Sequence, residues 1–563
     1  MNKEIYIKYF KKNRKGLLLL ILIIGMGTIV SGINPYVYGK IVDSISDKNV
    51  YSLKKWLLLF GTILIVTLIL ESIESLVGNW LTNITENQMK LNLFGHIFSI
   101  KCKKIDIYET GELFNKIEFD IENIVSYYLD CMTSILMIVV NLGISVYFIL
   151  NISKSLAGIT FITIPMLYFI NFIFQKKVYM MNQKIRIFTD KYYSFLNESL
   201  SEVIQIKAFG LENIVSQRYK EYLKERLRIL LKKEVLLQKI GFIRGGSGNI
   251  INVIILFIAG MSIVAGNMTI GMLVSFCSYM EKFFEALSKI MELNLNKQEV
   301  VVSYERMNEI LNSEKEENNG IILKEPIQKI QFRQVIFGYK DNLVLKKIDL
   351  SIENPGLYSL VGSNGCGKST IFKLLERFYE CKVGKIEINQ VPINKYSASD
   401  LRNNIVYMPK KPFFLQGTIM DNLKLGQNEI SDLEVIEVCK KVGIHSDIQK
   451  LEKGYYELIE SGGENFSSGQ KQKLGFVRVL LKKADIVLLD EVTSDLDGEA
   501  ERQICNQIEE IAKKAIVLNI AHKPESIRRS KKVFFIQGGK IVAEGTHKAL
   551  MKNCVDCKKI FAN

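Results

Sequence analysis

Several patterns that identify common classes of protein are missing from this sequence of 563 residues. Its nine cysteines include one closely spaced pair, Cys554 and Cys557, and the second pair that a zinc site needs is absent. The other cysteines are scattered, with Cys131 and Cys277 in or beside apolar runs. We therefore expect free thiols and no structural metal. Histidine is scarce too, with four residues in the chain.

A platform of aromatic and basic side chains that could bind nucleic-acid bases is also absent, although the net charge is +15. The Lys and Arg residues concentrate beside apolar segments, as the positive-inside rule and anionic lipid headgroups favour. A signal-peptide cleavage site is missing as well, because no small-residue site follows the basic residues Lys11 to Lys15 and the apolar run behind them. We expect a membrane protein with an uncleaved first helix and no nucleic-acid partner.

The first part of the chain does contain long apolar runs. The first, residues 16–36, is long enough to cross a hydrocarbon core of about 30 Å. Residues 82–130 and 175–244 carry heptad-like apolar positions between charges, which predicts helices that extend beyond the bilayer on the cytoplasmic side. The other candidate spans are residues 56–78, 131–150, 156–174, 250–265 and 271–290, which makes a multi-pass protein of the cell membrane with six spans.

The second part contains a nucleotide-binding motif, Gly-x-x-x-x-Gly-Lys-Ser, between a buried strand at 356–361 and a helix. Its glycines let backbone N–H groups point at phosphates, Lys368 brings a cation to the β- and γ-phosphates, and Ser369 offers a hydroxyl to Mg²⁺. The motif therefore predicts ATP or GTP as ligand. The expected contacts are Gly362, Ser363, Asn364, Gly365, Cys366, Gly367, Lys368, Ser369 and Thr370.

Two carboxylates, Asp490 and Glu491, end an apolar strand at 486–490. An acid at a strand end can reach Mg²⁺ beside a phosphate loop, which is the role we expect for Asp490. A second carboxylate beside the metal can polarise the water that attacks a γ-phosphate, which is the role we expect for Glu491. The alternative is a strand that ends in solvated acids.

Residues 466–470, Phe-Ser-Ser-Gly-Gln, resemble the signature of the ABC ATPases. The resemblance implies that Ser467 and Gly469, with Gln470, close over the γ-phosphate held by a partner subunit; the simpler alternative is a helix cap. It also implies that Tyr339 stacks on adenine and that His522 contacts the γ-phosphate. Residues 494–497 resemble the loop that couples the two ATP sites of the dimer.

Two positions depart from the family pattern. Lys410 stands where the family has a glutamine that contacts Mg²⁺ and the membrane domain. Because lysine has no acceptor and brings positive charge, we expect slow or differently gated hydrolysis. Ser461 stands where many exporters have glutamate. Since Glu491 and His522 are both present, we still expect an active ATPase.

The whole chain resembles a half-transporter of the exporter-type ABC fold: a multi-pass α-helical membrane domain at 1–312, a linker at 313–327 and a cytoplasmic α/β P-loop ATPase at 328–563. The resemblance implies ATP and Mg²⁺ as cofactors and a second half-transporter, identical or not, as partner. In that family the cytoplasmic bends dock into grooves on the ATPases. Export of a peptide, a drug-like molecule or a lipid is the first interpretation. The alternatives are an importer on the same fold, for a metal chelate for example, and a non-transporting ABC protein, which the spans disfavour.

Charged residues inside the predicted spans bear on the cargo. Glu71 and Glu74 lie deep in the second span, and Glu281, Lys282 and Glu285 interrupt the last. Such charges normally face a bundle interior or an aqueous cavity, which predicts a partly acidic cavity for a cationic or amphipathic cargo. The alternatives are spans shifted by a turn or a structural pair of Glu281 with Lys282. About 15 residues precede the first span, so we expect no N-terminal protease domain and a peptide cargo matured elsewhere.

Overall fold

The computed structural model describes residues 9, 12–108, 110–340, 342–427, 429–521 and 523–553. The chain forms two compact units. The helical unit comprises Met1–Phe98 and Glu109–Asn312, and the α/β unit comprises Ser99–Tyr108 and Ser313–Asn563. The short segment Ser99–Tyr108, between two long helices of the helical unit, therefore packs with the α/β unit. The family resemblance implied docking by a cytoplasmic bend, but no local pattern marked these ten residues.

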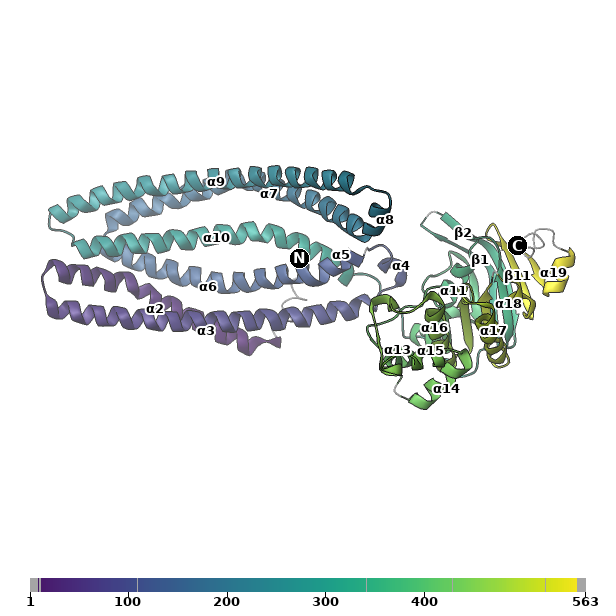
Figure 1. Cartoon of the computed structure of the whole chain (residues 1–563). Coiled ribbons are helices and arrows are strands. Elements are labelled where there is room, and N and C mark those ends of the chain that lie inside the picture. Colours follow the sequence, from purple (N-terminus) through teal and green to yellow (C-terminus); the bar gives the residue numbers. More distant parts are fainter. Residues whose placement is uncertain are drawn as a thin grey trace. The chain divides into compact units, whose positions relative to one another are not determined.

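Long helices make up most of the helical unit (Figure 1). They contain the six apolar runs that the sequence predicts as spans, except that the run 250–265 ends one residue beyond α9. Short helical pieces lie between them, including a π-helical turn that leads into the third long helix. The long helices are α2 (Arg14–Ser46), α3 (Val50–Ile97), α6 (Ile121–Ile152), α7 (Lys154–Ser201), α9 (Glu212–Val264) and α10 (Ile270–Leu311), and the short pieces are α5 (Thr110–Asn115), η1 (Lys116–Asp120) and α8 (Val203–Ala208).

By length and composition, three helices of the described residues can each cross a membrane: Arg14–Ser46, Val50–Ile97 and Thr110–Ile152. A shorter apolar helical stretch covers Asn249–Val264. The apolar run in α10 is interrupted by charged residues, as the sequence shows. The helical membrane region that the sequence predicts is thus confirmed.

Helix α2 packs along α3, α6 and α10, whereas α7 pairs mainly with α9 (Figure 1). Pro35 inside α2 has no N–H, so the carbonyl of Ser31 loses its intrahelical partner. Lys282 of α10 supplies a donor, with Nζ 2.6 Å from that oxygen. Tyr279 of α10 donates in the same way to the carbonyl of Gly32 at 3.0 Å. Lys282 is therefore bonded to the backbone carbonyl of α2 that Pro35 leaves without an intrahelical donor.

The larger sheet of the α/β unit has the strand order β12-β11-β3-β10-β9-β6. All its neighbours pair in parallel except β11 and β12. Every residue of β9 and of β10 is buried, as expected of parallel strands covered on both faces. The strands are β3 (Gly356–Val361), β6 (Ile405–Met408), β9 (Ile486–Asp490), β10 (Ile516–Ile520), β11 (Lys532–Gln537) and β12 (Lys540–Gly545).

A second, antiparallel sheet has the order β2-β1-β4-β5, and a two-stranded ladder joins β7 to β8. The strands are β1 (Lys329–Tyr339), β2 (Asn342–Glu353), β4 (Val383–Ile388), β5 (Val391–Pro392), β7 (Gly417–Thr418) and β8 (Leu458–Ile459). The helices of this unit are α4 (Cys102–Ile105), α11 (Lys368–Leu375), α12 (Ala398–Asn404), α13 (Ile419–Lys424), α14 (Asp432–Val442), α15 (His445–Gln449), α16 (Ser468–Lys482), α17 (Gly498–Ala512), α18 (Pro524–Arg528) and α19 (His547–Asn553).

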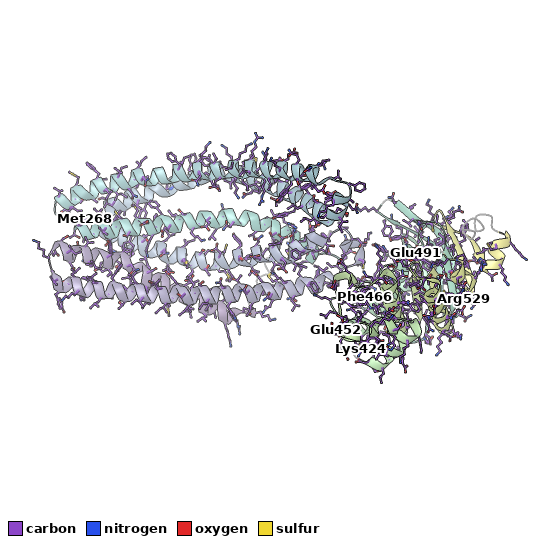
Figure 2. All side chains as sticks on the ribbon, viewed as in Figure 1. Met268, Lys424, Glu452, Phe466, Glu491 and Arg529 are labelled. Carbon is purple, nitrogen blue, oxygen red and sulfur yellow. The ribbon has the colours of Figure 1, made fainter. Side chains whose placement is uncertain are left out.

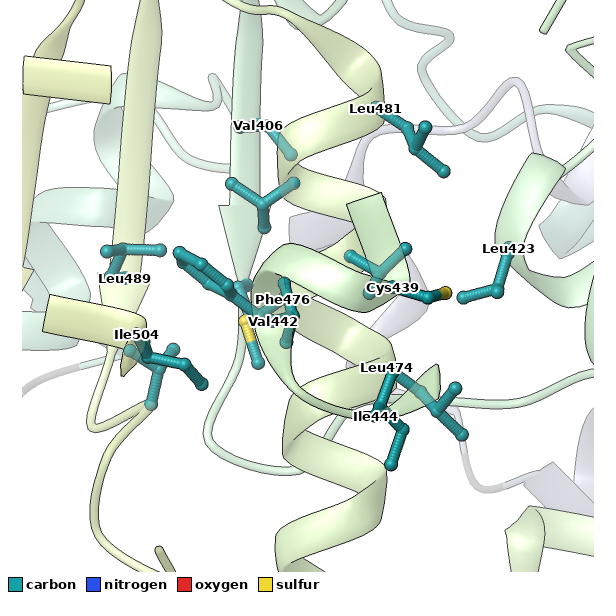
Figure 3. Close-up of a cluster of buried hydrophobic side chains, with 14 of the residues drawn as sticks. Val406, Leu423, Cys439, Val442, Ile444, Leu474, Phe476, Leu481, Leu489 and Ile504 are labelled. Carbon is teal, nitrogen blue, oxygen red and sulfur yellow. The ribbon is translucent and has the colours of Figure 1, made fainter. Parts of the chain in front are cut away.

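A buried hydrophobic cluster joins helix α16 to the larger sheet. Phe476 of α16 lies among Val406 of β6, Leu489 of β9 and Ile504 of α17 (Figure 3). Phe476, Leu489 and Ile504 are fully buried. Because a close-packed core holds its elements in fixed positions, this cluster fixes the start of α16 relative to the end of β9.

Candidate nucleotide-binding site

The motif residues meet at one edge of the larger sheet. Strands β3, β10, β9 and β6 are parallel, and their register pairs Leu360 with Ile520, Ile520 with Asp490, and Leu489 with Met408. The phosphate loop after β3, the acids that end β9 and the loop after β6 therefore emerge side by side. Parallel sheets bind ligands at this carboxyl edge.

The phosphate loop closes on itself through the motif lysine. Lys368 is 6% exposed, and its Nζ donates to the carbonyl of Gly362 at 2.8 Å and to that of Ser363 at 3.1 Å. Gly367 has φ 105°, a left-handed value that favours glycine. A Cβ at Gly362 would lie 2.1 Å from the carbonyl oxygen of Ile536. The loop therefore tolerates no side chain at Gly362. The Lys368 ammonium is held against the backbone of the same loop.

The other loop residues divide by exposure. Ser363, Asn364 and Gly365 are exposed and Cys366 and Thr370 are buried. The loop runs directly into α11, whose first N–H groups have no intrahelical acceptor. Exposed loop backbone ahead of a helix N-terminus is a suitable environment for phosphate.

The Ser369 hydroxyl and the Asp490 carboxylate lie next to each other. Burial raises the pKa of Asp490, and hydrogen bonds from Ser369 and Tyr407 oppose that rise. The Tyr407 hydroxyl donates to Asp490 Oδ2 at 3.3 Å, and burial together with the Asp490 charge raises the pKa of Tyr407. A hydroxyl and one carboxylate are oxygen donors that suit Mg²⁺, which keeps waters and shares phosphate oxygens. The residues present therefore fit Mg²⁺.

Glu491, labelled in the α/β unit in Figure 2, follows Asp490. Its φ of 54° is a strained backbone value for a residue other than glycine. Its backbone N–H donates to the carbonyl of Ile520 at 3.2 Å. Its carboxylate contacts the Lys410 ammonium, and that hydrogen bond and charge raise the pKa of Lys410. Lys410, the residue that departs from the family pattern, therefore forms an ion pair with Glu491.

The signature residues lie at the start of α16. Ser467 is the N-cap, and its Oγ accepts from the N–H of Gln470 at 3.2 Å while Gln470 Oε1 accepts from the N–H of Ser467 at 3.0 Å. A Cβ at Gly469 would lie 3.3 Å from the carbonyl oxygen of Asp495. Ser467 and Gln470 therefore do form a helix cap, and Ser467 remains exposed. The start of the helix packs against the loop of residues 494–497.

Tyr339 lies among other rings. Its ring meets that of Phe337 edge-on at 5.1 Å and that of Tyr379 at 5.2 Å, and Lys373 Nζ lies 5.5 Å from its centre. Only part of the surface of Tyr339 is buried.

His522 lies outside the described residues. Its neighbour Lys523 donates to the carbonyls of Thr493 and Leu496 at 2.8 and 3.3 Å and pairs with Glu501 at 3.1 Å. Lys523 therefore holds the loop that carries residues 494–497. Sequence reasoning missed both Lys523 and Tyr407, although each lies within three residues of a position that it singled out.

The segment Ser99–Tyr108 contacts the α/β unit near Tyr339. Ile100 forms an antiparallel bridge with Lys315, and the Tyr379 hydroxyl donates to Asp106. Arg402 binds Glu316 through two nitrogens at 2.7 and 2.9 Å. Tyr379 therefore contacts both this segment, at Asp106, and Tyr339, the residue expected to stack on adenine.

Comparisons with known proteins agree with this geometry. The family profile described as ABC transporter transmembrane region matches residues 17–287, and the profile described as ABC transporter matches residues 345–494. An uncharacterized ABC transporter ATP-binding protein, YfiC of Bacillus subtilis, is 28% identical over 96% of this chain and 90% of its own length. A putative export ATP-binding/permease protein of Rickettsia typhi is 27% identical over 97% of this chain and 96% of its own length.

A solved structure shares the fold. The structure of a bacterial Atm1-family ABC exporter with ATP bound superposes with a TM-score of 0.88 at 22% sequence identity. The match covers 98% of this chain and 99% of that one. The arrangement of helices and sheets described above is therefore that of an exporter-type fold over its full length.

Proposed function

Because the chain belongs to the ABC transporters, with an exporter-type transmembrane region followed by an ABC ATPase, we propose that two such chains form an ATP-driven exporter in the cell membrane. The hydrolysis of ATP coupled to transport is the activity of this class. The relatives named as export proteins favour export over import. We place the membrane domain at residues 1–312, the linker at 313–327 and the cytoplasmic ATPase at 328–563.

The adjacency of Ser369 and Asp490, with Glu491 next in the chain, carries the proposal. In the proposed site, Lys368 and the loop N–H groups bind the phosphates, and Tyr339 stacks on adenine. Ser369 and Asp490 hold Mg²⁺, which supplies charge neutralisation for the phosphates when bound. Glu491 accepts the proton of the attacking water, and His522 contacts the γ-phosphate.

The proposed partner completes each site. Ser467 is exposed at the start of α16, where a hydroxyl and helix N–H groups offer a second face for phosphate. We propose that this face closes over the ATP bound by the other chain, with Gly469 and Gln470 beside it. Binding in the closed dimer then biases the membrane domain toward one of two states, and hydrolysis resets it.

The cargo is proposed to be cationic or amphipathic. Glu71, Glu281 and Glu285 are exposed on helices predicted to span the membrane, and Glu74 is partly exposed. Exposed carboxylates at such depth avoid lipid and face water or a partner. Lys282 donates to the carbonyl of Ser31 at 2.6 Å. An acidic lining of this kind favours positive charge.

The decisive test is ATP hydrolysis by the purified chain in lipid nanodiscs, with Glu491→Gln as the variant and Glu464→Gln as a control at an exposed position. We expect Glu491→Gln to lower kcat roughly 100-fold or more, because loss of a general base costs that much. ATP binding, followed with a fluorescent analogue, should persist. Equal turnover in Glu491→Gln and wild type would rule out Glu491 as the base. Inactivity of both, with ATP bound, would point to a non-identical partner chain.

A further inference from the structure

The loop after β6 places a cation on the proposed catalytic base. Lys410 Nζ contacts Glu491 Oε2. The Lys410 side chain is 54% exposed and that of Glu491 is 18% exposed, so solvent reaches the pair. Asp490 and Asp495 also favour the charged form of Lys410. The ammonium therefore lies in an acidic environment whose nearest member is Glu491.

The loop that carries Lys410 is fixed by α16. A Cβ at Gly475 of α16 would lie 2.7 Å from Pro412 Cγ, so the loop rests directly on the helix backbone. Arg478, one turn further along, donates to the carbonyl of Phe413. Since proline also fixes the backbone at Pro412, the position of Lys410 is set by the scaffold.

The same short segment contacts both acids of the site. Tyr407, the third residue of β6, donates to Asp490, and Lys410 pairs with Glu491. A shift of this segment would therefore alter the surroundings of the proposed metal ligand and of the proposed base together.

The attacking water needs a lone pair of the Glu491 carboxylate to accept its proton. An ammonium in contact with Oε2 competes with the water for that oxygen and draws the carboxylate toward the loop. We infer that Lys410 is a positioning residue that restrains Glu491 and keeps basal ATP hydrolysis low. This inference rests on the proposed function, since it requires Glu491 to be the base.

Turnover of four proteins in nanodiscs tests the inference: wild type, Lys410→Gln, Lys410→Arg and Lys411→Gln. Lys411 is the matched control, because it is the neighbouring exposed lysine of the same loop. Lys410→Gln should raise basal kcat about two- to fivefold, the range that an exposed ion pair supports, with little change in the KM for ATP. Lys410→Arg and Lys411→Gln should match wild type. Higher salt should raise wild-type turnover more than that of Lys410→Gln, because salt screens the pair.

Unchanged or lower kcat in Lys410→Gln, with Glu491→Gln still inactive, would overturn the inference and leave the proposed function standing. If no protein hydrolyses ATP, the pairing of two identical chains fails, and carbodiimide labelling of Glu491 in the nucleotide-free protein decides the restraint. Peptide mass spectrometry should show faster labelling of Glu491 in Lys410→Gln than in wild type or Lys411→Gln. Equal labelling rates in all three would refute the restraint.

Discussion

Glu376, at the end of the phosphate-loop helix α11, is a carboxyl group buried in the α/β unit, 5% exposed. Burial raises its pKa from 4.5 to about 7, against the opposing effect of the nearby Lys482 and Arg402 charges. Because the folded-state pKa lies above the unfolded value, the folded protein binds more protons between these two values. The stability contributed by this group is therefore present at low pH and is lost as pH rises toward 7.

Glu376→Gln should remove this loss, since glutamine does not titrate. At pH 8 we expect the free energy of unfolding of the α/β unit to rise by up to about 3 kcal/mol, and the gain should shrink as the pH is lowered toward 5. Scanning calorimetry at both pH values measures this. The exposed Glu452 provides the control, Glu452→Gln, which should behave like wild type at each pH (Figure 2). A gain of the same size at pH 5 and pH 8 would contradict the titration.

Individual residues of the site differ in how far sequence could predict them. The phosphate loop follows from local spacing, because the glycine and lysine positions set the backbone of one continuous turn. The contact between Ser369 and Asp490 could be expected, since both follow parallel strands. The pairing of Lys410 with Glu491 depends on the register of β6 against β9, which no local pattern specifies. Their roles in hydrolysis stay predictions.

Helix α16 connects the signature residues to the loop of Lys410, and Gly475 is the point of closest approach. A Cβ at Gly475 would lie 2.7 and 2.9 Å from two carbons of Pro412 and 3.0 Å from Met408 Cε. The Pro412 ring is rigid, whereas Met408 Cε is the end of a flexible side chain. The helix and the loop are therefore packed with no room for a methyl group.

Gly475→Ala should destabilise the α/β unit by about 1–3 kcal/mol, the cost of overpacking a tight contact. Gly498→Ala is the control, because a Cβ at Gly498, also in a helix, meets nothing within 4 Å. Thermal unfolding followed by circular dichroism compares the two. An increase in stability for both variants, as helix propensity alone predicts, would show that the loop yields to the methyl group.

At the level of whole elements, hydrophobic runs and motif order predicted the helical part and the α/β part, and the fold confirms both. The family resemblance implied that a cytoplasmic bend docks on the ATPase, but which residues do so, Ser99–Tyr108, could not be read from the sequence. Their place in the α/β unit depends on contacts such as Tyr379 with Asp106 and the bridge of Ile100 with Lys315, which join residues far apart in the sequence. Local periodicity carries no information about such contacts.

The cargo proposal concerns the assembled transporter. Glu281 and Glu285 are one turn apart on α10, so they share a face, and both are exposed. If that face lines the cargo path, the double variant Glu281→Gln, Glu285→Gln should weaken stimulation of ATP hydrolysis by lipophilic cations about tenfold. This is the effect of losing one charge-assisted contact. Basal turnover should stay at the wild-type level.

Stimulation curves for cationic, neutral and anionic amphiphiles in nanodiscs measure this effect. The control is Glu225→Gln on the exposed part of α9 that the sequence places beyond the bilayer. An acidic cargo path would be excluded by two results together. Cationic amphiphiles would fail to stimulate wild-type ATP hydrolysis, and anionic amphiphiles would stimulate both wild type and the double variant.

The placement of Ser99–Tyr108 has a consequence for the order in which the protein is made. The ribosome releases this segment early, between two membrane helices, whereas Glu316, Tyr379 and Arg402, which surround it, are synthesised much later. The α/β unit is therefore discontinuous in the chain, and it cannot finish folding as its own residues emerge. The unit is complete only when its later residues pack against Ser99–Tyr108, which is synthesised earlier. An ATPase fragment that starts at residue 328 would therefore lack part of the unit's structure.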